Sequence, residues 1–279
     1  MTVRAVFACL VVSMGIAIAG PAAAATCDGH DVDVLVSNTT LVPGHTVLEG
    51  GDPRHPGIVL FHELPGLTHH DRMLGARLVC EGFHVYMPLM FGDVDQSNTA
   101  LGRRQACDPG ANGHPRFWCS NGAGEHPILG DWLRDAVKTI GADHRPIAGI
   151  GMCLTGTFAL SLAHAANVTV AVLAQPTLPF GFLKAADLDV PQDTLKIAIR
   201  DLADRQAGVF LVRARFDVIS TSDKVERLRV ALRRAAPDGL RDVYIRQVAG
   251  IRHSVLTVAA PKSDSPVMRD LLAMLRRHL

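Results

Sequence analysis

Residues 149–156 read GIGMCLTG, and this stretch decides the fold. An apolar run that ends in glycine leads directly into a segment with helical spacing, and Cys153 stands at the junction. A sharp strand-to-helix turn of this kind is where α/β enzymes lift a nucleophile out of a parallel sheet. The stretch therefore predicts an α/β architecture with a cysteine at its tightest bend.

Strand-like and helix-like segments alternate on both sides of this turn. Continuous apolar runs are typical of strands buried on both faces, and they are separated by segments of helical periodicity. An edge hairpin is expected near residues 32–49. The other predicted strands span residues 55–62, 84–90, 146–151, 168–174, 209–215 and 242–248, and the predicted helices span residues 69–82, 127–140, 154–166, 222–235 and 265–278. This alternation predicts a mostly parallel sheet covered by helices on both faces.

The N-terminus has the pattern of a secretory signal peptide. Basic Arg4 precedes an apolar run, a Gly-Pro pair breaks that run, and an A-x-A cleavage pattern ends at Ala25. The run is shorter than the roughly 20 residues that a membrane span needs. We therefore expect residues 1–25 to be removed without leaving a membrane anchor, and the mature protein to be secreted or periplasmic. Residues 26–279 are then expected to form a single domain with insertions near residues 91–126 and 176–205.

The composition is that of an ordinary globular protein. The chain has 279 residues, of which 48% are apolar and 20% are charged, and its formal net charge is +1. This length suits one large α/β domain. Binding to a phosphate backbone usually needs clustered Lys and Arg, and the balanced charge offers no such excess, so we expect no nucleic-acid partner. Composition does not indicate an oligomeric state.

Cleavage of the signal peptide removes Cys9 and leaves an odd number of cysteines. The five that remain are Cys27, Cys80, Cys107, Cys119 and Cys153. Exported chains tend to pair their cysteines. Cys107 and Cys119 bracket a stretch rich in Gly, Pro and Asn, so we expect a disulfide there, and Cys27 and Cys80 are the candidates for a second. Cys153 is left over, either as a reactive thiol or as a buried inert one.

Three polar residues stand just past the ends of three predicted strands, in the order nucleophile, acid, histidine: Cys153, Asp217 and His253. The carboxyl ends of parallel strands open onto a common crevice, so these side chains are expected to meet. A cysteine attacks as its thiolate, and its ordinary pKa is about 8.5, so it needs a helix N-terminus or a cation nearby. His253 would accept the thiol proton, and Asp217 would orient the imidazole. Taken singly, Asp217 could be a helix cap and His253 a surface residue.

The segment HELPGL at residues 62–67, the cysteine turn, and the downstream Asp217 and His253 together resemble the dienelactone hydrolase family. The resemblance extends over most of the mature chain. It implies the α/β-hydrolase fold and a triad in which Cys153 is the nucleophile, Asp217 the orienting acid and His253 the base.

The same resemblance implies roles for the residues beside the triad. Glu63 matches a glutamate that approaches the resting thiol and helps to switch it between thiol and thiolate. The backbone N–H groups of Leu64 and Leu154 match the oxyanion hole. Two features depart from the family pattern: Thr155 stands where the family has glycine, and the arginine that follows the histidine and binds a substrate carboxylate is absent after His253.

Residues 62–63 and 69–71 (HE and HHD) carry side chains of the types that bind metal ions. Zinc peptidases place both histidines of H-E-x-x-H on one face of a helix. Here Pro65-Gly66 would break a helix at that point. We expect no metal site and no cofactor, and we assign residues 69–71 to the start of the following helix, where an acid is favourable.

A thiolate nucleophile restricts the substrate. In the tetrahedral intermediate the sulfur is itself a good leaving group, so a simple alkoxide loses the competition and the substrate re-forms. We therefore expect small activated esters, enol lactones or thioesters as substrates, without fixing which one. Two alternatives remain. A binding protein could keep the pocket without the chemistry, which the two departures favour, whereas a thiol–disulfide oxidoreductase would lack the C-x-x-C pair that such chemistry favours.

Overall fold

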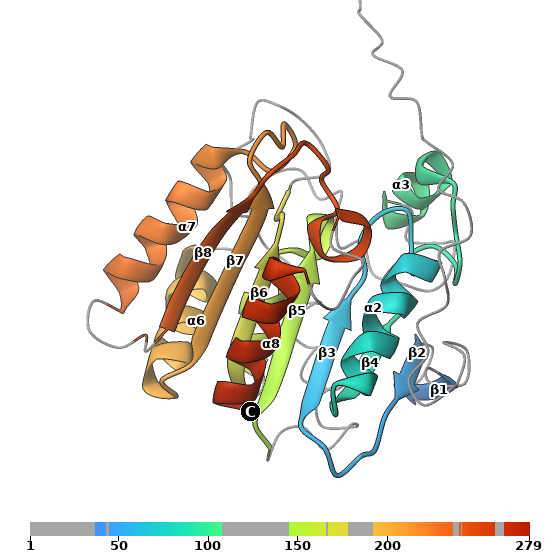
Figure 1. The fold of residues 1–279 in the computed structure, drawn as a ribbon, viewed down its shortest axis with the longest axis horizontal. Helices are drawn as coiled ribbons and strands as arrows, with labels where there is room; N and C mark the ends of the chain where they lie inside the picture. The colour runs from blue at the N-terminus through green and yellow to red at the C-terminus, as the bar shows by residue number, and fades with distance from the viewer. Residues whose placement is uncertain are drawn as a thin grey trace, which may run out of the picture.

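The structure is a computed structural model that describes residues 37–42, 45–107, 145–165, 167–177, 192–236, 240, 242–259 and 265–279. Within these ranges it contains one eight-stranded sheet with the strand order β1-β2-β4-β3-β5-β6-β7-β8 (Figure 1). The strands are β1 (Ser37–Val42), β2 (His45–Gly50), β3 (Gly57–Phe61), β4 (His84–Pro88), β5 (Ile147–Met152), β6 (Val168–Ala174), β7 (Gly208–Ala214) and β8 (Asp242–Val248). The helices are α2 (His69–Cys80), α3 (Thr99–Cys107), α5 (Phe158–Ala165), α6 (Gln192–Asp204), α7 (Ser222–Ala235) and α8 (Pro266–His278).

The sheet is mostly parallel, as predicted. Strands β1 and β2 form an antiparallel hairpin at one edge, and β2 runs antiparallel to β4. The pairs from β4 through β3, β5, β6 and β7 to β8 are all parallel. The carboxyl ends of β3, β5, β6 and β7 therefore lie along one end of the sheet, with β3 next to β5.

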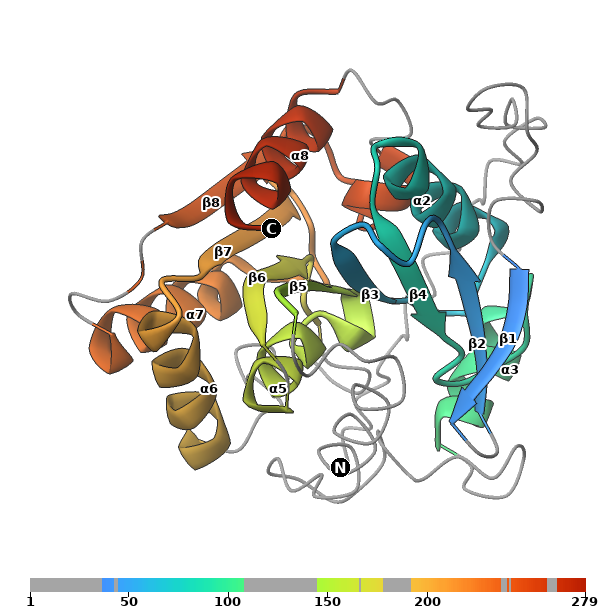
Figure 2. The same ribbon diagram turned by 90° about the horizontal axis from the view of Figure 1, so that it is seen from below.

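Helices cover both faces of the sheet. Figure 2 shows α2 and α8 on one face and α5, α6 and α7 on the other. Strand β7 shows why its sequence is continuously apolar: Val209 and Leu211 pack into the core beneath α5 to α7, while Phe210 and Val212 pack into the core beneath α2 and α8. Burial on both faces requires an unbroken apolar run.

Two segments differ from the sequence prediction. The helix expected at residues 154–166 begins later, because a 3-10 turn, η1 (Cys153–Thr155), precedes α5. Helix α3 lies inside the first predicted insertion, for which no helix is predicted. Helix α6 lies in the second insertion, which is predicted to be partly helical. The helix predicted at residues 127–140 falls outside the described residues.

The predicted signal peptide also lies outside the described residues, so the division of the chain into a leader and one domain stays a prediction. The same holds for both expected disulfides, because Cys27, Cys119 and the side chain of Cys107 are not described. Helices in the described part of the chain are all too short or too polar to cross a bilayer.

Candidate active site

The cysteine turn is built from close backbone approaches. Cys153 follows β5 directly and adopts a φ of 52°, in the left-handed region that costs an ordinary side chain on the order of 1–3 kcal/mol. A Cβ on Gly151 would lie 2.1 Å from the carbonyl oxygen of Thr155, and one on Gly156 would lie 2.5 Å from the Cα of Pro176. Glycine is therefore required at both positions. The turn leaves Cys153 only 7% exposed at the carboxyl end of β5.

Thr155 stabilises this turn through its hydroxyl group. The side chain is fully buried, and its Oγ1 lies 3.0 Å from the carbonyl oxygen of His62 and 2.9 Å from that of Met152. It also accepts a hydrogen bond from the N–H of Met152 at 3.0 Å. The residue that departs from the family glycine thus links the cysteine turn to the loop after β3, and the tightest packing falls on the neighbouring glycines instead.

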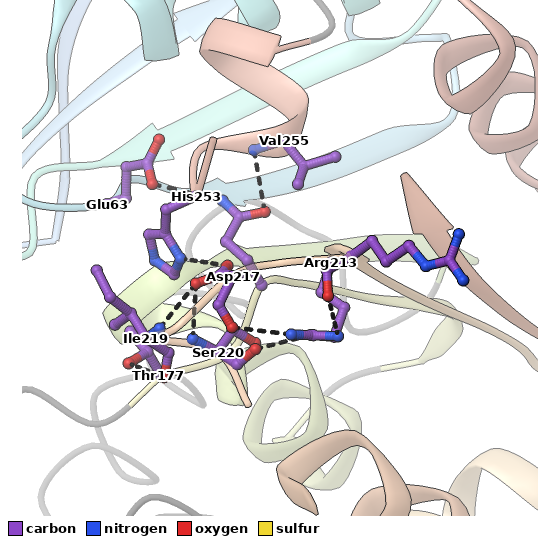
Figure 3. A network of polar contacts seen from close by, with 10 residues as sticks. Glu63, Thr177, Arg213, Asp217, Ile219, Ser220, His253 and Val255 are labelled. Atoms are coloured by element: carbon purple, nitrogen blue, oxygen red, sulfur yellow. Dashed lines mark hydrogen bonds and ion pairs between the residues drawn. The ribbon is translucent and has the colours of Figure 1, made fainter. Parts of the chain in front are cut away.

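Asp217 and His253 are joined by a short hydrogen bond. His253 Nδ1 lies 2.6 Å from Oδ2 of Asp217, while Oδ1 accepts hydrogen bonds from the N–H groups of Ile219 (2.9 Å) and Ser220 (3.0 Å) (Figure 3). Burial acts to raise the pKa of Asp217, but the hydrogen bond to His253, the positive charge of His253 and the two amides outweigh it and leave the pKa lowered. Asp217 is therefore a carboxylate that fixes the orientation of the imidazole ring.

Arg213 holds the loop that carries Asp217. Its guanidinium group is buried and donates to three backbone carbonyl oxygens of the loop, those of Ser220 (2.7 Å), Asp217 (2.9 Å) and Arg215 (3.3 Å) (Figure 3). Sequence reasoning missed this residue. A signal was present, since an arginine inside the otherwise apolar strand VFLVRA needs buried acceptors.

Cys153, His253 and Glu63 form one cluster. One polar atom from each side chain lies within 4.8 Å of the other two. Among the described residues, His253 Nε2 has no hydrogen-bond partner, which leaves it available to a proton from Cys153. Burial opposes the charged form of His253, but the negative charge of a Cys153 thiolate and the hydrogen bond to Asp217 raise the pKa of His253 to about 11. Asp217 and a negative charge at Cys153 therefore both favour the imidazolium form of His253.

Glu63 is anchored from two directions. Its Oε1 accepts a hydrogen bond from Thr257 Oγ1 at 2.7 Å, and its Oε2 accepts one from Gln175 Nε2 at 3.4 Å. Gln175 Oε1 in turn accepts the N–H of Val255 at 3.3 Å, which ties the segment after His253 to the end of β6. Gln175 and Thr257 were not identified from the sequence, although Gln175 follows a strand end in the same way as the predicted site residues do.

The two predicted oxyanion-hole residues lie on adjacent loops. Leu154 is buried directly after Cys153 in η1, and Leu64 follows Glu63 and packs against the core beneath α5. Because β3 and β5 are neighbours in the sheet, both backbone segments lie at the same end of it. The donor role of their N–H groups stays a prediction.

His62 is used structurally. Its Nδ1 bonds to the carbonyl oxygen of Glu63 at 3.1 Å, and its Nε2 accepts the N–H of Met90 at 2.9 Å. Both ring nitrogens of His62 are therefore occupied by hydrogen bonds, which leaves neither of them free to bind a metal ion.

The profile of the dienelactone hydrolase family matches residues 45–254, three quarters of the chain. The chain belongs to the dienelactone hydrolase family. Membership of this family makes it a hydrolase and implies a small-molecule substrate. No curated protein sequence matches the chain.

Solved structures of dienelactone hydrolase-like proteins share this fold. A dienelactone hydrolase-like promiscuous phosphotriesterase from metagenomic libraries is 20% identical, with a TM-score of 0.54 over 87% of this chain and 95% of that one. A Klebsiella pneumoniae protein assigned as a dienelactone hydrolase is also 20% identical, with a TM-score of 0.55 over 87% and 98%. The thioesterase domain from the curacin biosynthetic pathway is 11% identical, with a TM-score of 0.51 over 86% and 98%. These likenesses confirm the predicted α/β-hydrolase fold.

Proposed function

We propose that the protein is an exported hydrolase of activated esters, enol lactones or thioesters that works through a Cys153–His253–Asp217 triad. The observation that carries the proposal is the free, buried thiol of Cys153 within 4.8 Å of an imidazole that Asp217 holds at 2.6 Å. The chain order of the three groups, nucleophile, acid and histidine, supports the proposal, because each follows the end of a strand at the same end of the sheet.

The reaction begins with transfer of the thiol proton from Cys153 to His253. The thiolate attacks the carbonyl carbon of the substrate, and the negative charge moves to the carbonyl oxygen. As the intermediate collapses, the bond to the leaving group breaks, the leaving group departs as its anion, and a thioester with Cys153 remains. The sulfur of the thioester carries no charge, so His253 then releases its proton to solvent and becomes a neutral base. Water then attacks the thioester while His253 accepts its proton, and the acid product leaves with the thiolate restored. Asp217 stabilises the imidazolium and keeps Nε2 directed at the reacting atoms.

Backbone donors at Leu64 and Leu154 are proposed to bind the oxygen of the intermediate. Removing one donor of this kind typically raises the barrier by about 2.7–4 kcal/mol. Glu63 is proposed to adjust the balance between thiol and thiolate at Cys153, because its carboxylate lies in the same cluster and opposes a second negative charge there. Its carboxylate is buried and accepts hydrogen bonds from the neutral side chains of Gln175 and Thr257.

The electrostatics of His253 support the choice of substrate. Because the pKa of His253 is raised to about 11, the imidazolium is a weak acid toward the leaving group while Cys153 is ionised. Enolates, phenolates and thiolates depart without a proton, whereas a simple alkoxide does not. Once Cys153 is acylated its negative charge is gone, so the pKa of His253 falls and the ring can act as base for the attacking water.

The test compares an aryl ester with the ethyl ester of the same acid on purified protein. We expect rapid turnover of the aryl ester, turnover of the ethyl ester slower by orders of magnitude, and loss of both in Cys153→Ala. Equal rates on the two esters would count against a thiolate nucleophile. If neither ester is turned over and Cys153→Ala binds ligands as the wild type does, the protein is a non-catalytic binder with a hydrolase fold.

Export is tested separately. Secreted or periplasmic material should begin at or near Thr26 by N-terminal mass spectrometry, whereas an intact leader starting at Met1 would oppose the proposal.

A further inference from the structure

Asp71 is a second buried carboxylate beside the candidate site. It lies in the first turn of α2, where Thr68 caps the helix, and it is 0% exposed. Its Oδ2 accepts hydrogen bonds from the backbone N–H of Thr68 (2.8 Å) and from Thr68 Oγ1 (2.5 Å). Its Oδ1 is buried and has no hydrogen-bond partner among the described residues. One oxygen therefore lacks the donors that stabilise a full negative charge in a protein interior.

Among the charged groups around Asp71, the negative charge of Glu63 is the one that raises its pKa. Helix α2 packs against β4, β2 and η3 (Val255–Ala259). Besides Asp71, the described titratable side chains on these elements, on α2 and on the loop before it are Glu49, His62, Glu63, His69, His70, Arg72, Arg77, His84 and Tyr86. Glu49 pairs with His84, and Arg72 pairs with Asp95 on the outer side of the helix.

Two neighbouring buried carboxylates cannot both ionise without a large electrostatic repulsion between them. Burial and the negative charge of Glu63 raise the pKa of Asp71 to about 8, and the hydrogen bonds from Thr68 and the backbone N–H of Glu63 offset only part of this rise. Glu63 in turn contacts the cluster of Cys153 and His253. The charge state of Asp71 is thus linked to the site through Glu63.

We propose that Asp71 is a positioning residue that holds a proton beside Glu63, so that this buried carboxylate pair carries a single negative charge at neutral pH. The consequence for catalysis rests on the proposed function. When Asp71 is neutral, Glu63 lies near the Cys153 thiolate and no second carboxylate charge is added beside Glu63. When Asp71 ionises, the added negative charge disfavours both the thiolate and the oxyanion of the intermediate.

The direct test is infrared difference spectroscopy between pH 6 and pH 9. The wild type should show the carbonyl band of a protonated carboxylic acid that disappears with a midpoint near pH 8. Carbon-13 labelling of aspartate carboxyl groups should shift the band, and labelling of glutamate should not. Asp71→Asn should remove it. The control is Asp95→Asn, which removes a half-exposed carboxylate beside the same helix and should retain the band.

The second readout is the pH profile of kcat/KM for p-nitrophenyl acetate. Between pH 7 and pH 9, kcat/KM of the wild type and of Asp95→Asn should fall about tenfold relative to kcat/KM of Asp71→Asn. This is the change expected when the pKa of a neighbouring group moves by one unit. Absence of an aspartate-derived acid band in the wild type would overturn the proposal, and this result needs no variant to fold. If the acid band is present but no ester is hydrolysed, the proposed function is wrong, whereas the protonation of Asp71 is still supported. A band with identical pH profiles in wild type and Asp71→Asn would overturn the link to catalysis.

Discussion

Replacing Arg213 by methionine tests whether its guanidinium group fixes the position of Asp217. Methionine keeps most of the apolar length of the side chain and removes the donors. Three carbonyl oxygens, those of Arg215, Asp217 and Ser220, then lose their charged donor. We expect the loop to loosen and the bond between Asp217 and His253 to lose its alignment.

The expected loss in the free energy of unfolding follows from the geometry of these hydrogen bonds. Hydrogen bonds to charged groups contribute about 1.5–3 kcal/mol each, and the 3.3 Å contact counts for little. Two good bonds would give about 3–6 kcal/mol, from which the desolvation of a buried guanidinium without a carboxylate partner must be subtracted. We therefore expect Arg213→Met to lower the free energy of unfolding by about 2–3 kcal/mol, and kcat to fall with KM nearly unchanged.

Urea unfolding and steady-state kinetics on an aryl ester provide the measurement. The matched control is Arg215→Met, which removes an exposed arginine two residues along the chain. It should unfold within about 0.5 kcal/mol of the wild type, as surface substitutions usually do. If the two variants have the same stability and the same kcat, Arg213 does not position the acid loop and this reading of its contacts is wrong.

Two further predictions concern the cysteine turn and the histidine. Thr155→Val keeps the shape of the side chain but leaves the buried N–H of Met152 without its acceptor. We expect the free energy of unfolding in urea to fall by about 1–3 kcal/mol, and Thr155→Ser to restore most of it. Equal stability of the three proteins would refute the role of the hydroxyl group. Cys153→Ala removes the largest influence that raises the pKa of His253, while burial still lowers it. By NMR, His253 should remain protonated at pH 9 in the wild type and be neutral there in Cys153→Ala, and identical titrations would contradict the thiolate–imidazolium pair.

The regular part of the fold could be predicted from the sequence. Residues 168–174, 222–235 and 242–248 were predicted with the bounds that β6, α7 and β8 have in the structure. The signals for β6 and α7 are local: a continuous run rich in β-branched residues for a strand buried on both faces, and a capping threonine with helical spacing for the helix. Helix α3 was missed because it is only nine residues long and has Gly102, a residue of low helix propensity, near its middle.

The cysteine turn shows where local periodicity fails. Helical spacing continues through residues 154–157, yet α5 begins only at Phe158, because the left-handed Cys153 forces a tighter 3-10 turn first. A pattern of apolar positions carries no information about such backbone strain.

The candidate site was predictable where chain order alone decided it. Cys153, Asp217 and His253 each follow a strand, and parallel strands bring their ends together. The supporting contacts depend instead on which loops meet in space: Glu63 is separated from Gln175 by 112 residues and from Thr257 by 194. No spacing rule connects residues so far apart.

The central claim is that Cys153 is ionised by His253, and the pH dependence of alkylation tests it most directly. The second-order rate constant of Cys153 with iodoacetamide should be high and nearly constant from pH 6 to pH 8 in the wild type. It should fall at least tenfold at pH 6.5 in His253→Ala. Equal rate constants in the two proteins across this range would contradict the account.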